Sequence, residues 1–181
     1  MISYKYFSTF IGNHDVLTFI LGGLSKSLAL PQMKLSWIIL NGPAGLVEEA
    51  KKRLEVIADT YLSVNAPVQN ALSSWLPAAD SIQEQIKDRI LANYTFLKEL
   101  QQKNRLSVLL AEGGWYAVID MPGMEDDLVL RMLEDQKVYI HPGYFYDFDQ
   151  MHCCVVSLLT PEDVMKEGIQ KLIDFQSGGR T

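Results

Sequence analysis

The sequence predicts an α/β protein built from two unequal parts, and three observations support this fold class. Residues 16–21 and 35–40 are short apolar runs that end at glycine or at Asn-Gly, as strands of a covered sheet do. Apolar residues then recur at helical spacing as far as Lys103, and short strand patterns alternate with helices after Asn104. We therefore expect the end of a larger α/β domain, a linking helix and a small α+β domain, in residues 1–75, 76–103 and 104–181.

The first part contains two expected strands and one expected helix. Residues 16–21 are rich in β-branched and aromatic side chains, so we expect a strand buried on both faces, as in a parallel sheet, and the same holds for residues 35–40. The connection, residues 24–34, contains Pro31 and is expected to be a loop. A helix is predicted for residues 45–58 from the spacing of Leu46, Ala50, Leu54 and Ile57. This part has too few strands to close its own sheet, so we expect that a segment of the protein is missing upstream.

The linking segment is dominated by one long helix. A proline-containing loop, residues 63–67, precedes a short helix that Pro77 to Asp80 interrupts. Asp80 or Ser81 is expected to cap the long helix, which continues to about Lys103. Its apolar face is formed by Ile82, Ile86, Ile90, Tyr94 and Leu97.

The last part alternates strands and helices. We expect strands at 107–110 and 115–120, joined at Gly113-Gly114, and further strands at 138–140 and 153–158. A helix is predicted at 125–136. Pro161 is expected to begin the final helix, whose apolar face carries Val164, Ile169 and Leu172.

Composition argues against several classes of partner and site. The chain has 22 acidic and 16 basic residues and a net charge of −6, which speaks against nucleic acid or an anionic membrane as the main partner. The longest apolar run, residues 16–24, is too short to span a bilayer. Cys153 and Cys154 are adjacent, so a disulfide between them would be strained, and their spacing makes a poor metal site. Free thiols suit a reducing compartment, and we expect a cytoplasmic protein without a bound metal.

The segment after the first strand contains a candidate nucleophile and candidate phosphate ligands. There the strand leads into Ser25-Lys26-Ser27, and Lys34 follows eight residues after Lys26. A lysine amine can attack an aldehyde when apolar surroundings or a neighbouring cation lower its pKa. The serine hydroxyls and the Lys34 ammonium are suitable donors to a phosphate group. By spacing alone, however, a lysine between serines in a loop is an ordinary feature.

The sequence of residues 22–37 resembles the active-site signature of class I/II (fold-type I) aminotransferases, which depend on pyridoxal 5'-phosphate. In that signature a Ser-Lys pair is followed by a short loop, an arginine eight residues after the lysine, and an aromatic residue. The resemblance implies that Lys26 is the catalytic lysine, which forms an aldimine with the cofactor and later moves the substrate proton. It also implies that Ser25 and Lys34 contact the cofactor phosphate, with Lys34 in the place of the usual arginine.

The resemblance continues in order through the rest of the chain. Residues 63–69 resemble a loop that reaches the partner subunit's cofactor site, which implies a homodimer. Residues 112–116 and 138–145 resemble two small-domain segments near the substrate, and the second contains the candidate substrate contacts His141 and Tyr144. The aromatic cluster at residues 144–148 is interpreted first as part of the core or of an interface, and second as a wall of the substrate site.

One departure concerns the substrate. The family's arginine for the substrate carboxylate usually lies two residues before a serine on a late strand, and here Val155 precedes Ser157 with no arginine in residues 132–179. Either the carboxylate is bound elsewhere or the substrate is not an ordinary α-amino acid.

The resemblance thus implies the C-terminal half of an aminotransferase that exchanges an amino group between an amino acid and a 2-oxo acid through Lys26. We expect the 181-residue chain to be inactive by itself, because the family's acidic partner for the cofactor's pyridine nitrogen lies upstream of the lysine, and the sole carboxylate there is Asp15, just before the first strand. The alternatives are a lyase or decarboxylase on the same fold and a non-catalytic, aminotransferase-like ligand-binding module.

Overall fold

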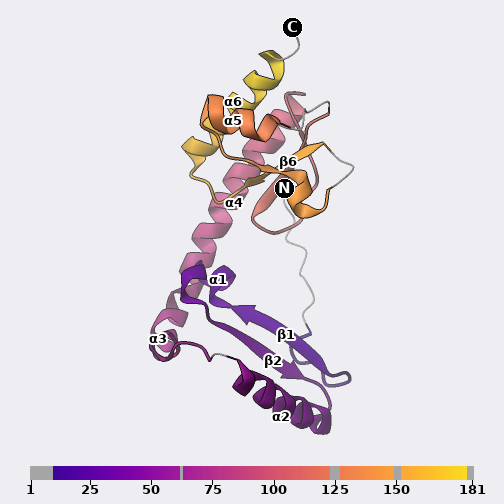
Figure 1. Ribbon diagram of the computed structural model, residues 1–181, viewed down its shortest axis with the longest axis vertical. Coiled ribbons are helices and arrows are strands. Elements are labelled where there is room, and N and C mark those ends of the chain that lie inside the picture. Colours follow the sequence, from indigo (N-terminus) through magenta and orange to yellow (C-terminus); the bar gives the residue numbers. More distant parts are fainter. Residues whose placement is uncertain (1–9, 62, 123–126, 149–151, 179–181) are drawn as a thin grey trace. The chain divides into compact units, whose positions relative to one another are not determined.

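The computed structural model describes residues 10–61, 63–122, 127–148 and 152–178, and they form two compact units (Figure 1). The first unit ends at Gln85 and the second begins at Ile86. The long helix α4 (Ala79–Gln102) contributes its first turns to the first unit and the remainder to the second. Both units combine helices with a β-sheet, as the sequence predicts.

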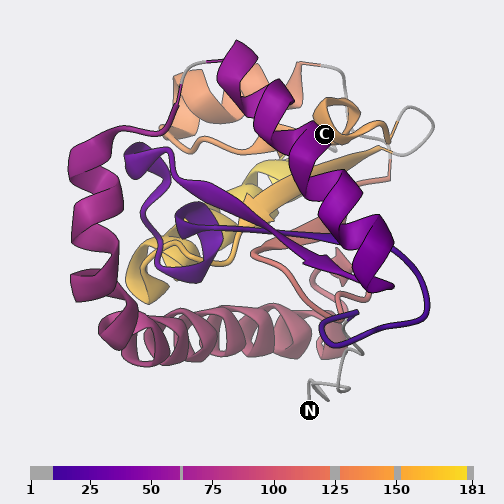
Figure 2. The ribbon, with the colours of Figure 1, turned by 90° about the horizontal axis from the view of Figure 1, so that it is seen from below.

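The first unit is built on a two-stranded sheet. Strands β1 (Thr18–Gly23) and β2 (Ser36–Asn41) are antiparallel, with Thr18 opposite Asn41 and Gly23 opposite Ser36. Helix α2 (Ala44–Thr60) lies along this pair in both views (Figures 1 and 2). The remaining elements of the unit are short, namely α1 (Leu24–Ser27), η1 (Pro31–Met33), α3 (Ala66–Trp75) and η2 (Leu76–Ala78).

Three expectations for this unit are corrected. The strands form where predicted, but they are antiparallel rather than parallel, because α1 and η1 reverse the chain locally instead of carrying it across the sheet. They are also not buried on both faces, since Phe19 and Leu21 are 49% and 77% exposed. The expected loop at 24–34 contains both short helices, so Lys26 lies on a helix.

The second unit is a four-stranded antiparallel sheet packed against helices. The strand order is β3-β4-β6-β5, so β6 lies between β4 and β5. Its elements are β3 (Ser107–Val108), β4 (Tyr116–Asp120), α5 (Leu128–Gln136), β5 (His141–Pro142), η3 (Gly143–Tyr146), β6 (Cys153–Ser157) and α6 (Glu162–Gly178). One face of the sheet and the buried sides of α4, α5 and α6 enclose the core, which contains Leu97, Ile119, Met132, Cys154, Val156 and Leu172.

Three details from α4 onward differ from expectation. The strand expected at 138–140 forms instead at His141–Pro142. Helix α4 begins at Ala79, directly after η2, so neither Asp80 nor Ser81 is its cap. Val164 is 53% exposed, and the buried side of α6 is formed by Met165, Ile169, Leu172 and Ile173. The start expected for α5, at residue 125, lies outside the described residues.

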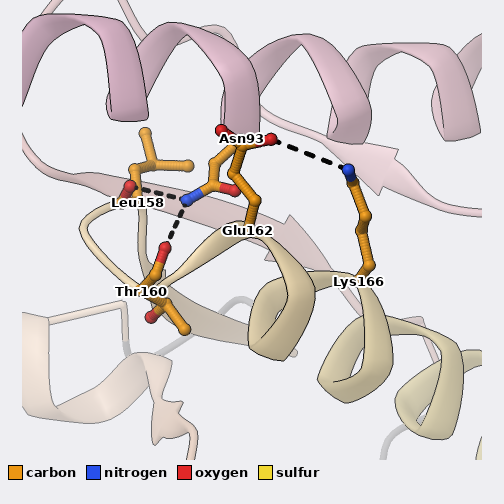
Figure 3. A network of polar contacts seen from close by, with 5 residues as sticks. All are labelled: Asn93, Leu158, Thr160, Glu162 and Lys166. Atoms are coloured by element: carbon orange, nitrogen blue, oxygen red, sulfur yellow. Dashed lines mark hydrogen bonds and ion pairs between the residues drawn. The ribbon is translucent and has the colours of Figure 1, made fainter.

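A buried asparagine joins α4 to the turn between β6 and α6 (Figure 3). The Asn93 amide nitrogen Nδ2 donates to the carbonyls of Leu158 and Thr160 at 2.8 and 2.7 Å. Two carbonyl acceptors fix the orientation of this amide, because only its NH2 group can serve both. Asn93 is 1% exposed, and within the described structure its Oδ1 has no hydrogen-bond partner. Asn93 therefore holds the end of β6 against α4.

Replacement of Asn93 is expected to destabilise the fold. Asn93→Ala leaves two buried carbonyls without a donor and should lower the free energy of unfolding by about 2–3 kcal/mol. Asn93→Asp should cost more, because its carboxylate oxygens face carbonyl oxygens. Urea denaturation followed by circular dichroism measures both, with the exposed neighbour Thr95→Ala as the control on the same helix. Equal stability of Asn93→Asp and wild type would contradict this role.

Candidate functional site

Lys26 is held on the exposed side of α1 by leucines on the opposite side. Leu24 and Leu28 are buried one helical turn apart, and they anchor α1 in a small apolar cluster with Leu35. The Leu28 and Leu30 amides both donate to the Leu24 carbonyl at 3.1 Å. Because Lys26 lies about half a turn from Leu24, the same anchoring directs its side chain away from the cluster. The backbone of α1 is thus fixed while residue Lys26 lies at the surface.

The strand end before α1 requires glycine. A Cβ atom at Gly22 would overlap the indole ring of Trp37, which lies opposite it on β2. At Gly23 a Cβ atom would lie 3.1 Å from the Cβ of Ser36, which is a tight contact. The two glycines therefore let β1 and β2 approach closely where the chain enters α1.

The two serines beside Lys26 have different surroundings. Ser27 Oγ donates to the Gly23 carbonyl at 2.7 Å, so this hydroxyl stabilises the turn into α1. The Ser27 carbonyl accepts from Gln83 Nε2 at 3.1 Å, which ties α1 to the start of α4. Ser25 is half-buried on the first turn of α1. Of the two serines, Ser25 is the better donor to a ligand.

Lys34 lies at the end of the connection to β2. It follows η1 in the left-handed conformation, with φ of 53°, and its side chain is exposed. A non-glycine residue in this conformation is uncommon. The donor set of this segment fits pyridoxal phosphate in chemical terms: Lys26 offers a primary amine for the aldehyde carbon, and Ser25 and Lys34 offer a hydroxyl and an ammonium for the phosphate.

The second unit presents a different candidate surface, on the sheet face opposite the core. Val155 lies opposite His141 on β5 and Val118 on β4, and Tyr116 lies opposite Ser157. Directly opposed residues share a face, whereas Cys154 and Val156 belong to the core cluster. Val155 is nevertheless 3% exposed. The position where the family resemblance implies an arginine is therefore apolar and covered, on the same face as His141.

His141 is held by an aromatic residue that the sequence did not identify as functional. Its Nδ1 lies 2.7 Å from the Tyr146 hydroxyl, because η3 brings the chain back over five residues. Partial burial, and then the nearby Tyr116 and Tyr139 hydroxyls, raise the pKa of Tyr146, so it stays protonated at neutral pH. The hydroxyl and Nδ1 share one hydrogen bond, and the tautomer of His141 decides which of the two groups donates it.

Tyr144 lies on the outer side of η3. It is 62% exposed, and its ring packs edge-on against Phe145 at a centroid distance of 5.0 Å. Tyr144 and His141 belong to the second unit, whereas Ser25, Lys26 and Lys34 belong to the first. The sequence signal for Tyr146 was the spacing of aromatic residues after Pro142-Gly143, which also fits a simple core role.

Other types of site have no support in the described residues. Within them, no group of three or more His, Cys, Asp and Glu side chains is arranged to hold a metal ion. No helix in the described part of the chain is long and apolar enough to cross a membrane.

The comparisons with known proteins agree with the sequence resemblance. The family model described as aminotransferase class I and II matches residues 6–172. Curated relatives include glutamate-pyruvate aminotransferase AlaA of Haemophilus influenzae, 27% identical over 92% of this chain, and AlaA of Escherichia coli K12, 29% identical over 91%. The chain spans 43% of the length of each. The crystal structure of tyrosine aminotransferase from Leishmania infantum shares the fold, with a TM-score of 0.76, 19% identity, and coverage of 92% of this chain and 42% of that one.

Neither cysteine is expected to react in the folded protein. Burial raises the pKa of Cys154 to about 12, and burial followed by the Asp120 charge raises that of Cys153. At pH 8 the Cys154 thiol is thiolate in only about one molecule in ten thousand, and the pKa of Cys153 is shifted in the same direction. Iodoacetamide at pH 8 should therefore label neither residue in native protein and both in urea, as mass spectrometry measures. Rapid labelling of Cys154 in the native state would show that β6 opens readily.

Proposed function

The chain belongs to the class I and II aminotransferases, and from this membership we propose that the protein transfers an amino group between an amino acid and a 2-oxo acid. The observation that carries the proposal is the presentation of Lys26, on the exposed side of a short helix anchored by Leu24 and Leu28. The family match, residues 6–172, includes this helix. The relatives from Haemophilus influenzae and Escherichia coli are named glutamate-pyruvate aminotransferases, which supports small amino acids and 2-oxo acids as substrates.

We assign the cofactor contacts to the first unit. Bound pyridoxal phosphate supplies an electron sink for the substrate's Cα–H bond. Lys26 Nζ would hold the cofactor and would take up and return the substrate's proton. The buried leucines under α1 keep the amine in place during this transfer. Ser25 donates through its hydroxyl and Lys34 through its ammonium to the phosphate, Lys34 as a point charge rather than as a bidentate fork.

We assign substrate contacts to His141 and Tyr144 of the second unit. The contact between Nδ1 and the Tyr146 hydroxyl holds the imidazole ring of His141, and we assign the other ring nitrogen, Nε2, to a polar group of the substrate. Val155 offers no charge on this face, so the substrate carboxylate binds a cation elsewhere in the whole protein. Residues 1–75, 76–103 and 104–181 then correspond to part of the cofactor domain, the linking helix and the small domain.

A lyase or decarboxylase on the same fold would use the same lysine. Amino-group transfer is favoured because the relatives carry aminotransferase names. A ligand-binding module without catalysis would hold the cofactor on the same lysine but would show no turnover. Product analysis separates these functions, because only transamination converts the added 2-oxo acid into an amino acid.

We further propose a homodimer in the cytoplasm. The exposed apolar side chains of the β1–β2 pair, including Phe19, Leu21 and Ile38, support an additional packing partner. Cys153 and Cys154 are both free and buried, which fits a reducing compartment.

Borohydride reduction of the complete protein loaded with pyridoxal phosphate is expected to leave the pyridoxyl group on Lys26. Peptide mapping by mass spectrometry identifies the modified lysine. The label and the transfer of an amino group from glutamate to pyruvate should both disappear in Lys26→Ala. Lys52→Ala, at an exposed position of α2, is the matched control and should keep both. A label on another lysine of a folded protein would refute the assignment of Lys26.

Lys34→Ala is expected to weaken pyridoxal phosphate binding by about 1.5–3 kcal/mol, the usual contribution of a hydrogen bond to a charged group. Lys34→Arg should retain most of the affinity, because its guanidinium keeps the charge. Absorbance titration of the apoprotein gives the dissociation constants, again with Lys52→Ala for comparison. If Lys34→Ala bound the cofactor as tightly as wild type, another residue would have to bind the phosphate.

A further inference from the structure

The second unit contains a cavity where the chain separates from the edge of β6. Strand β5 pairs with β6 only through His141↔Val155 and Pro142↔Cys154. In a continued ladder Tyr139 would lie opposite Ser157, but residues 138–140 are not in a strand. A cavity of about 530 Å³ lies here, between this segment, β6 and α6. Its volume falls within the roughly 300–1,000 Å³ of small-molecule sites.

The β-ladder directs a backbone donor toward this gap. The Leu158 amide donates to the Trp115 carbonyl, and the Met121 amide donates to the His152 carbonyl. In an antiparallel ladder the residues between such pairs turn their backbone groups to the other neighbouring strand. The N–H group of Ser157 therefore points toward the position that Tyr139 leaves open. The Ser157 carbonyl is already used, because it accepts from Thr160 Oγ1 at 2.9 Å.

Helix α6 forms one wall of the cavity, and a glycine in this wall leaves space that a side chain would occupy. Gly168 lies in the middle of α6, where glycine is less favourable than alanine. A Cβ atom there would lie 3.7 Å from Val138 Cγ1, an ordinary contact. Alanine thus fits at this position without a clash, whereas a longer side chain would extend into the cavity.

The cavity combines an apolar interior with a cationic rim. Apolar side chains of β6, α6 and the 138–140 segment form most of its lining, among them Ile140, Val155, Val156, Met165 and Leu172. Two lysines and one glutamate also line it: Lys137, Lys171 and Glu167. Lys171 Nζ pairs with Glu167 at 2.7 Å, and Lys137 Nζ donates to the Glu134 carbonyl, so the ammonium of Lys137 is not paired with a carboxylate that lines the cavity. His141 adds a polar group at the sheet end.

We propose that this cavity binds a small organic acid with an apolar chain, its chain between β6 and α6 and its carboxylate at the Lys137–Lys171 rim. Apolar chains gain free energy by leaving water, and a carboxylate is the group that complements an excess of ammonium charge. The cavity shares His141 with the proposed substrate contacts, whereas the Lys26 segment belongs to the other unit. Its occupation is measured without pyridoxal phosphate or turnover, so a failure of octanoate binding is distinguishable from a failure of the proposed activity.

Octanoate is a suitable probe, and calorimetric titration into the complete protein at low ionic strength should give saturable binding of one molecule per chain. Gly168→Leu should weaken binding about ten-fold or more, because its side chain fills the space of the octyl chain. Lys137→Ala combined with Lys171→Ala should weaken it about five-fold, and octanol should bind more weakly than octanoate by a similar factor. Added salt should reduce octanoate binding and leave octanol binding unchanged.

Matched variants separate binding from folding. Gly168→Ala keeps most of the cavity, and Lys166→Ala removes an exposed lysine of α6 that does not line it, so both should bind octanoate like wild type. Circular dichroism confirms that each variant is folded. Absence of saturable octanoate binding, including the case in which another segment of the complete protein fills the cavity, would overturn the proposal. Equal binding by Gly168→Leu and Gly168→Ala, or equal affinity for octanol, would overturn it as well.

Discussion

The alternation of side chains along β6 is the constraint on which the second unit depends. Cys154 and Val156 enter the core with α4, α5 and α6, while Val155 and Ser157 face the other side with His141 and Tyr116. A shift of one residue would exchange these sets and place a serine hydroxyl in the core. Asn93 opposes such a shift, because its two hydrogen bonds fix the carbonyls just beyond the strand. The free energy that stabilises the core thus also sets the geometry of the outer face.

In the candidate cofactor segment, too, buried apolar side chains determine which residues are exposed. The cluster of Leu24, Leu28 and Leu35 holds a four-residue helix that would not be stable in isolation. Close approach of the strands at Gly22 and Trp37 sets the point where the helix begins. A reactive amine needs a fixed backbone and a side chain that substrate can reach, and α1 provides both for Lys26. The apolar residues around the signature therefore position the lysine, and its proposed role depends on them.

Residues 138–141 show how a local departure from regular structure creates a binding surface. Their β-branched and aromatic content predicts a strand, yet only His141 and Pro142 join β6. The preceding residues separate from the sheet, and the space they leave is bounded by α6 at Gly168. The same bend allows η3 to return Tyr146 to His141. Two polar features of the second unit, the histidine pair and the cavity rim, thus arise from one irregular connection.

The sequence by itself determined the fold class, the approximate positions of most helices and strands, and the family, because periodicity and the Ser25-Lys26 signature are local properties of the chain. Patterns of this kind report how much of a segment is buried. They do not report which segment covers it. The antiparallel pairing of β1 with β2, the exposure of Leu21, and the separation of residues 138–140 from β6 were decided by contacts between distant residues. The pairing of His141 with Tyr146 also required tertiary structure, since a hydrogen bond across a turn depends on backbone angles that neither residue type specifies.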